Sequence, residues 1–142
     1  VLGTSDLSKD TRVRHTPDRL GFIAALNLCV YAARAHGLTV IDGVQLDLEN
    51  DELLHASCEQ GRDLGFDGKS LIHPNQIAAA NTVFAPDEAE IVAAKGIIKA
   101  FEEALAQGKG VVVVNGRLVE NLHVEEAKRQ IALAATIAQL SG

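Results

Sequence analysis

The sequence has few aromatic residues and an excess of negative charge. Its 142 residues include no Trp, no Met, one Tyr and four Phe, and the formal net charge is −6. Nucleic-acid binding needs a positive electrostatic field and aromatic side chains on which bases stack. This chain offers neither of them, so we exclude nucleic acid as a partner.

Cysteine is equally scarce, with Cys29 and Cys58 as the two examples. They fall in different predicted helices, so they indicate neither a disulfide framework nor a paired metal motif. Cys29 lies in an apolar helix and is interpreted as a small core residue. His55 and Cys58 are three residues apart on a predicted helix, but no second pair completes a metal site. We therefore expect a reducing, cytoplasmic location.

Long uncharged runs are missing. The apolar run from Leu20 to Ala33 is shorter than the roughly 18 residues that cross a bilayer, so no membrane span is predicted. The opening VLGTSDLSKDTR has neither the basic start nor the apolar middle of a secretory signal, and it has no initiating Met. With 47% hydrophobic residues the chain can still bury the core of one globular domain.

Residues 1–80 show apolar runs and turn signals that predict alternating strands and helices. Strands are expected near Leu2, over 38–44 and over 69–74, with helices over 16–37, 47–61 and 74–80. Alternation of this kind predicts parallel strands joined by crossovers. Three parallel strands cannot close a barrel, so we expect this region to be the carboxyl-terminal part of a larger α/β barrel whose first half is missing. A small self-sufficient α/β domain is the alternative.

Residues 81–142 have a different pattern, which predicts a helix, a β-hairpin and a second helix. The first helix is expected over 86–107 and the last over 122–140. Between them, VVVVNGRLVE places two apolar runs around Asn115-Gly116, a strong hairpin signal. An exposed apolar ribbon is prone to aggregation unless it packs on something. We therefore expect this appendage to pack against the barrel or another subunit.

Three aspartates follow predicted strands, where a parallel barrel places its chemistry. Asp6 follows LGTS, Asp42 follows LTVI, and Asp47 comes shortly after. Carboxylates at this end of a barrel can hold a divalent cation such as Mg²⁺, which prefers one or two protein carboxylates with water and substrate oxygens. A lone Asp6 would need a partner carboxylate. The alternative is that Asp6 and Asp42 cap helices or turns.

The segment GFDGKS, at 65–70, is not a phosphate-binding loop. That motif needs a Gly where Asp63 stands, and it joins a strand to a helix, whereas this segment precedes a strand. Lys69 and His73 are polar positions along the predicted strand, and they face either the ligand end of the barrel or its rim. Arg14 and His15 could contact an anionic group, although a solvated loop is the simpler interpretation.

Glu120 follows the predicted hairpin, where it could reach a ligand. A carboxylate held close to a substrate can act as a general acid or base when burial raises its pKa. The alternative is a solvated glutamate at a helix N-terminus, where negative charge is favoured by the helix dipole. The spacing of the residues leaves both possibilities open.

Four segments together resemble a known family. LGTSDLSKDTR, LTVIDGVQLDLEND, GFDGKSLIHPNQI and GKGVVVVNGRLVENLHVEEAKR are similar to the carboxyl half of citrate lyase beta subunit-like proteins, the CoA-ester lyases of the HpcH/HpaI aldolase superfamily. The resemblance covers nearly the whole chain in the same order. It implies a (β/α)8 TIM barrel with strands 6 to 8 in residues 1–80, and a possible lid on a neighbouring subunit in 81–142.

The resemblance also implies site residues. The family's Mg²⁺-binding Asp at the sixth strand matches Asp6, while its Glu and its substrate-binding Arg would lie before Val1. Backbone amides at Thr4 and Ser5 would meet the carboxylate of a keto acid. The family brings an acidic residue, usually Asp, from the appendage of a neighbouring subunit, and Glu120 is the matching position. Its extra methylene leaves that role open.

The activity that the resemblance implies is Mg²⁺-dependent cleavage of a C–C bond in a 3-hydroxyacyl-CoA of the citryl, malyl or citramalyl type. The products would be an acyl-CoA and a keto acid, and the enzyme would be a homo-oligomer, a trimer or hexamer. Two alternatives stay open: a thioesterase acting on malyl-CoA or a similar ester, and a catalytically incomplete assembly fragment.

Overall fold

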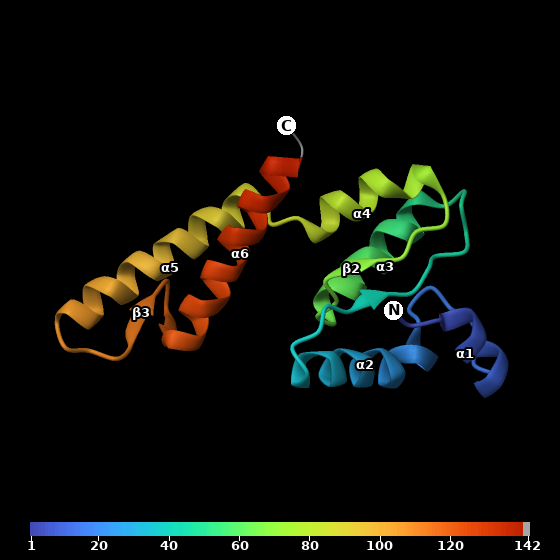
Figure 1. The fold of residues 1–142 in the computed structure, drawn as a ribbon, viewed down its shortest axis with the longest axis horizontal. Helices are drawn as coiled ribbons and strands as arrows, with labels where there is room; N and C mark the ends of the chain where they lie inside the picture. The colour runs from blue at the N-terminus through green and yellow to red at the C-terminus, as the bar shows by residue number, and fades with distance from the viewer. Residues whose placement is uncertain (141–142) are drawn as a thin grey trace. The chain divides into compact units, whose positions relative to one another are not determined.

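A computed structural model describes residues 1–140 and divides the chain into two compact units, 1–84 and 85–142 (Figure 1). The first unit contains α1 (Thr4–Thr11), η1 (Leu20–Phe22), α2 (Ile23–Ala35), β1 (Ile41–Asp42), α3 (Asp51–Asp63), β2 (Gly68–Lys69), η2 (Pro74–Gln76) and α4 (Ile77–Phe84). The second contains α5 (Glu88–Ala106), β3 (Val112–Val114), β4 (Arg117–Val119) and α6 (Asn121–Leu140). Because α4 continues to Phe84, the first unit extends past the expected boundary at residue 80.

The first unit is built on a short parallel pair of strands. Ile41 lies opposite Gly68 and Asp42 opposite Lys69, with α3 between the two strands in the chain. The ladder is extended at one end, where the Asp67 amide donates to the Val40 carbonyl at 2.9 Å. This is the strand, helix, strand unit expected from the alternating pattern.

Arg34 ties the end of α2 to this sheet. Its two terminal nitrogens donate to the two Asp67 carboxylate oxygens at 2.9 and 2.8 Å, and Asp67 also accepts from the Val40 amide at 2.8 Å. A bidentate pair of this kind fixes orientation as well as distance. The side chains of Arg34 and Asp67 therefore fix the register of the two strands, in addition to the backbone hydrogen bonds between the strands.

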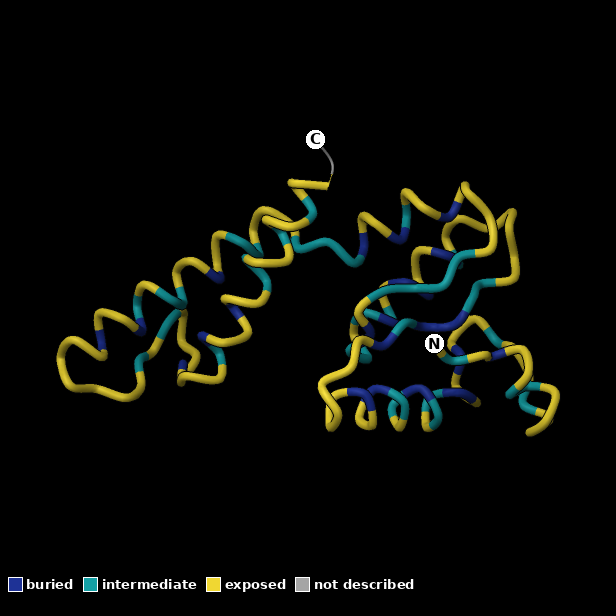
Figure 2. Tube along the Cα trace, viewed as in Figure 1, coloured by how far each residue is buried: buried dark blue, intermediate teal, exposed yellow. Residues whose placement is uncertain are grey.

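Two hydrophobic clusters form the core of the first unit. The larger one contains Phe22, Leu26, Val30, Ala33, Val40 and Phe66. The second contains Leu54, Cys58, Ala80 and Val83. Figure 2 shows the consequence for α2, which has a buried face and an exposed face. Leu28 and Tyr31 are on the exposed face, 67% and 66% accessible.

The structure corrects three expectations for residues 1–80. The expected first strand near Leu2 is not formed: Val1–Gly3 make no strand pairing with any of the described residues, and α1 begins at Thr4. The expected strand over 69–74 is limited to Gly68–Lys69, because residues 72–76 turn into η2. Thr16–Asp18 form a turn, and α2 starts only at Ile23 after the 3₁₀ turn η1.

The second unit forms the helix, hairpin and helix that the sequence predicts. α5 begins with a capping box: the Asp87 side chain accepts from the Glu90 amide at 2.7 Å, and the Glu90 side chain accepts from the Asp87 amide at 2.9 Å. Val112 pairs with Val119 across the hairpin, and both pack on a cluster with Phe101 and Val124. The packing of the hairpin on α5 and α6 gives this unit a core of its own.

The hairpin turn confirms the Asn-Gly signal. Asn115 has φ 49° and Gly116 has φ 76°, so both residues are left-handed, as a type I′ turn requires.

Within residues 1–140, no helix combines the length and apolar character needed to span a membrane.

These backbone angles generate a prediction for two glycines of the second unit. Gly116→Ala places a Cβ in a left-handed residue, so we expect a loss of about 1 kcal/mol in the free energy of unfolding. Gly96 lies in the middle of α5, and a Cβ there meets no atom within 4 Å. Gly96→Ala is the matched control and should gain about 0.5–1 kcal/mol. Urea unfolding followed by circular dichroism measures both, and equal effects of the two changes would contradict the turn assignment.

Candidate functional site

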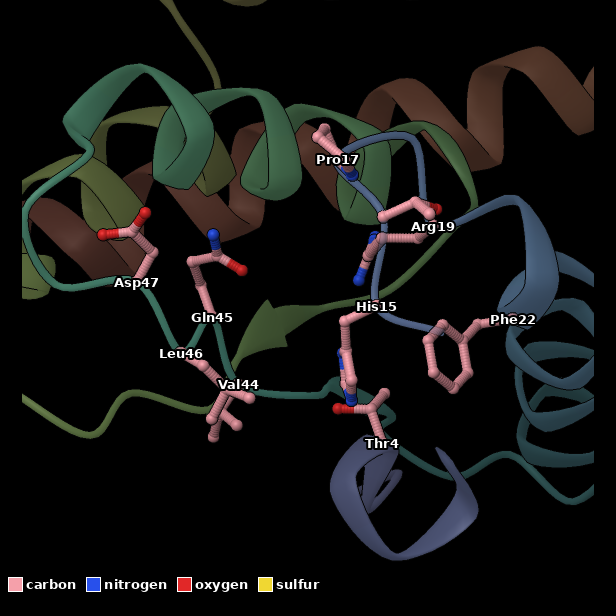
Figure 3. Close-up of a pocket in the computed structure, with 10 residues that line it drawn as sticks. Thr4, His15, Pro17, Arg19, Phe22, Val44, Gln45, Leu46 and Asp47 are labelled. Atoms are coloured by element: carbon pink, nitrogen blue, oxygen red, sulfur yellow. The ribbon is translucent and has the colours of Figure 1, made fainter. Parts of the chain in front are cut away.

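A cleft of about 160 Å³ lies beside the parallel strands of the first unit (Figure 3). Thr4 comes from the start of α1, His15 and Arg19 from the loop before η1, and Gln45 to Asp47 from the loop after β1. The remaining lining residues are Thr16, Pro17, Phe22 and Val44. The cleft is therefore at the carboxyl end of β1, where open α/β folds bind their ligands.

Thr4 provides an unsatisfied polar group in this cleft. The residue is 5% exposed, and its Oγ1 makes no hydrogen bond to any of the described residues. Gly43 allows this placement, because a Cβ on Gly43 would lie 2.8 Å from Thr4 Cγ2 and 2.9 Å from the Leu2 carbonyl oxygen. A buried hydroxyl without a partner costs free energy unless a ligand or water satisfies it.

Asp6 and Ser5 lie next to Thr4 on the first turn of α1, and both are exposed. Gly3 precedes the helix without a side-chain cap, so the first-turn amides have no protein acceptor in that role. Neither Asp6 nor Ser5 lines the cleft. Among residues 1–140, no three His, Cys, Asp or Glu side chains gather to hold a metal ion. A magnesium site at Asp6 would therefore need further donors from outside the described residues.

Asp42 does not face the cleft as a free carboxylate. It is fully buried and bound by two cations, with Arg19 Nη1 2.7 Å and Lys69 Nζ 3.0 Å from its Oδ2. Arg19 Nε also donates to Gln60 Oε1 at 2.5 Å. Arg19 adopts φ 51°, a left-handed conformation, at the end of the 16–18 turn. The structure thus uses Asp42 to anchor the loop before η1.

The space around this cluster is closely filled. A Cβ on Gly61 would lie 2.8 Å from Asp42 Oδ2, so glycine lets α3 approach the carboxylate. The Lys69 side chain is 0% exposed. Burial lowers the pKa of Lys69, and the adjacent Asp42 carboxylate opposes that change. Burial raises the pKa of the Cys58 thiol, which makes it a neutral core group.

The other candidate residues have structural roles in the described part of the chain. His55 is exposed and lies 3.5 Å from Glu59, whereas Cys58 is buried, so these residues form no metal pair. His73 caps η2, with its Nδ1 2.8 Å from Asn75 Oδ1. His15 does line the cleft, and its ring is 5.0 Å from that of Phe22.

Glu120 precedes α6 in the second unit. Its amide donates to His123 Nδ1 at 3.0 Å, and its carbonyl accepts from the His123 amide at 3.0 Å. The residue is exposed. The helix N-terminal position that the sequence allowed is thus the one observed. Glu120 belongs to the second unit, whereas the cleft belongs to the first unit.

Sequence reasoning missed Arg19 and the contribution of Lys69 to the charge cluster. Asp42 and Lys69 are register partners on adjacent parallel strands. The predicted strands place Asp42 near a carboxyl end and Lys69 at an amino end, so their bounds did not indicate this pairing. Arg19 offered no signal either, because it reaches Asp42 from a loop 23 positions earlier in the chain.

The strand pair and the cleft at its carboxyl end define the first unit as part of an α/β ligand-binding fold. Comparison with known proteins is more specific. The chain belongs to the HpcH/HpaI aldolase/citrate lyase family, which matches residues 1–74. The identification from the four sequence segments is thereby confirmed.

Relatives extend the match over nearly the whole chain. A (3S)-malyl-CoA thioesterase from Cereibacter sphaeroides is 55% identical over 138 residues, which are 97% of this chain and 48% of that protein. Citrate lyase subunit beta from Leuconostoc mesenteroides is 39% identical over 94% of this chain and 44% of its own length. This chain therefore spans about half the length of these relatives.

A solved structure agrees with the fold. CitE from Mycobacterium tuberculosis, in complex with magnesium, acetoacetate and coenzyme A, aligns with a TM-score of 0.64 and 25% sequence identity. The alignment covers 74% of this chain and 38% of CitE. The structures share an α/β fold. The assignment of residues 1–80 to barrel strands 6 to 8 stays a proposal.

The buried charge cluster predicts unequal effects for its members. Asp42→Asn leaves Arg19 and Lys69 as two buried cations without a carboxylate, so we expect a loss of about 3–5 kcal/mol in the free energy of unfolding. Lys69→Met leaves Asp42 paired with Arg19, so the loss should stay below about 2 kcal/mol. Chemical denaturation at neutral pH measures both, and a larger loss for Lys69→Met would contradict the arrangement.

The pH dependence of Lys69 provides a check on the same pair of variants. Burial lowers its folded-state pKa below the ordinary value of 10.5, so the unfolded chain holds this proton more tightly. The free energy contributed by Lys69 to folding should therefore improve as pH rises from the folded pKa toward 10.5. The difference between wild type and Lys69→Met should show this rise, and a flat difference would contradict it.

Proposed function

We propose that this chain is the carboxyl-terminal half of an enzyme that acts on malyl-CoA or a similar CoA thioester, and that it hydrolyses the thioester. The observation that carries this proposal is the 55% identity to (3S)-malyl-CoA thioesterase over 97% of the chain. That match includes both units, and therefore both Asp6 and Glu120.

Cleavage of a C–C bond to an acyl-CoA and a keto acid is the second candidate. It is favoured by the 39% identity to citrate lyase subunit beta and by the family itself. This was the first expectation from sequence, with hydrolysis as its alternative. Hydrolysis now ranks ahead of C–C cleavage, because the identity to the thioesterase is 55% and that to citrate lyase subunit beta is 39%.

The size of the cleft supports a small acid as the bound group. Its volume of about 160 Å³ is below the roughly 300–1,000 Å³ of pockets for drug-sized ligands. A short acid fits this space, and the nucleotide part of CoA would bind outside it. The Thr4 hydroxyl, which has no partner among the described residues, lies buried beside this space. We propose that the acid portion of the thioester, or its keto-acid product, binds here.

The start of α1 would hold the charged end of that acid. First-turn amides carry the positive end of the helix dipole, which stabilises a carboxylate. We assign the amides of Thr4 and Ser5 to this contact and the Asp6 carboxylate to Mg²⁺, with a second donor from outside the described residues. Bound Mg²⁺ would polarise the substrate oxygens and stabilise developing negative charge.

Glu120 is proposed to move the proton in either reaction. As a base it would accept a proton from attacking water, and as an acid it would donate one to the acyl-CoA enolate. Its exposure leaves it accessible to a second subunit. We propose that residues 85–142 act as a lid on a neighbouring subunit of a trimer or hexamer. Residues 1–84 would contribute strands 6 to 8 of the barrel, in the cytoplasm.

Product identity tests the reaction. We propose a chimera in which this chain replaces the aligned 138 residues of the Cereibacter sphaeroides thioesterase. With malyl-CoA and Mg²⁺, we expect free CoA thiol and intact malate. Release of acetyl-CoA and glyoxylate would support the lyase instead. An inactive but folded chimera would contradict both reactions and favour the assembly-fragment hypothesis.

Two substitutions in the chimera test the residue roles. Asp6→Asn should lower kcat at least about a hundredfold and abolish the response to added Mg²⁺, because one carboxylate donor is lost. Glu120→Gln should lower kcat about a hundredfold with little change in KM, because proton transfer is lost and binding is kept. Glu102→Gln, an exposed change on α5, is the matched control. Wild-type turnover in either variant would remove that residue from the site.

A further inference from the structure

One wall of the cleft is an irregular loop. Residues 43–50 join β1 to α3, and Gln45, Leu46 and Asp47 line the cleft (Figure 3). A segment outside helices and sheets has no ladder of hydrogen bonds to fix its conformation. Its position must come from other contacts.

The ends of the loop are anchored by its neighbours. At the start, Gly43 packs closely on the Leu2 carbonyl. At the end, Asn50 caps α3, with its Oδ1 accepting from the Leu53 amide at 2.9 Å. Inside the loop, Asp47 Oδ1 accepts from the Glu49 amide at 3.0 Å. These contacts leave the carbonyls of the cleft wall to be satisfied from elsewhere.

Gln76 provides the buried contact to this wall. Its side chain is fully buried, with the residue 1% exposed. Nε2 donates to the Gln45 carbonyl at 3.1 Å, and Oε1 accepts from the Ile72 amide at 3.0 Å. Both ends of the amide are therefore used, and each joins a different loop. A buried hydrogen bond of this kind is costly to lose, because its partner stays desolvated.

Asn75 provides a second contact at the loop surface. Its Nδ2 donates to the Leu48 carbonyl at 3.2 Å, and its Oδ1 lies 2.8 Å from His73 Nδ1. Pro74 occupies the first turn of η2, and His73 is extended with φ −148°, as a residue before proline prefers. The segment 73–76 therefore presents two neighbouring amides to the same loop.

We propose that Gln76, assisted by Asn75, is a positioning residue that sets the conformation of the cleft wall at 45–47 and so determines how tightly the cleft holds its ligand. His73 acts through Asn75 and does not touch the ligand. The effect on ligand binding rests on the proposed function. The effect on the conformation of the wall is independent of it.

Gln76→Glu tests the buried contact, because it changes one group and keeps the shape. The carboxylate retains an acceptor for the Ile72 amide but presents an oxygen to the Gln45 carbonyl, so the wall should be disturbed. Burial raises the pKa of such a carboxyl, and its protonated form regains an O–H donor. The wall should therefore be disturbed near about pH 8 and restored near about pH 5.

Nuclear magnetic resonance of the 142-residue chain provides the readout. We expect the Leu46 ¹⁵N shift to move and the Glu49 amide to exchange about tenfold faster at the higher pH, with reversal at the lower pH. Gln76→Met has no donor at either pH and should stay disturbed. Gln139→Glu makes the same chemical change at an exposed position of α6 and should leave residues 45–49 unchanged.

Wild-type shifts and exchange in folded Gln76→Met, which has no donor at either pH, would overturn the proposal. A disturbance of Gln76→Glu that persists at the lower pH would do the same. If Gln76→Glu does not fold, Asn75→Asp decides, because Asn75 is exposed and the change removes its donor to Leu48. Disturbance at residues 45–49 in that variant supports the proposal, and wild-type behaviour overturns it.

Kinetics of the chimera test the effect on the ligand. At the higher pH, Gln76→Glu should raise the KM for malyl-CoA about tenfold with kcat within about threefold, and the lower pH should reverse the change. An unchanged KM with a disturbed loop would overturn the part of the proposal that concerns binding. An inactive wild-type chimera would contradict the proposed function, while the resonance data would still decide the positioning of the wall.

Discussion

The first unit depends on one buried carboxylate shared by two cations. Asp42 stands at the end of β1 and binds Lys69 on the neighbouring strand and Arg19 in the loop before η1. In a low-dielectric interior, a carboxylate without partners would be strongly unfavourable. The same contacts that satisfy Asp42 therefore hold the Arg19 loop against the sheet. Because Arg19 and His15 line the cleft, this ion cluster sets one wall of the site.

The opposite wall is held by uncharged groups. Gln76 and Asn75 donate amide hydrogens to carbonyls of the loop after β1. Arg19 and Asp47 border the cleft itself, and the Thr4 hydroxyl lies buried beside it without a partner among the described residues. The support of the wall at 45–47 comes from residues that do not line the cleft.

The proposed chemistry requires more than the described residues provide. Asp6 is a single carboxylate beside the cleft, and Glu120 belongs to the other unit. Hydrolysis and C–C cleavage both use a polarised carbonyl and a proton-transfer group. In hydrolysis, a water oxygen supplies the electron pair that attacks the thioester carbonyl. In C–C cleavage, the electron pair comes from the C–C bond that breaks. In the proposed reactions these two roles fall to side chains of different units, Asp6 for the metal and Glu120 for the proton.

Local chemistry was readable from the sequence wherever neighbours in the chain decide the structure. The Asn115-Gly116 turn, the Asp87 helix start and the alternation of strand and helix were predictable, because turn angles, caps and periodicity act over a few residues. Tertiary structure alone decided the pairing of Arg19 with Asp42 and the hydrogen bond from Gln76 to the Gln45 carbonyl. It also decided that Thr4 begins a helix. Each depends on groups brought together from distant parts of the chain, and the burial that makes those contacts strong exists only once the chain has folded.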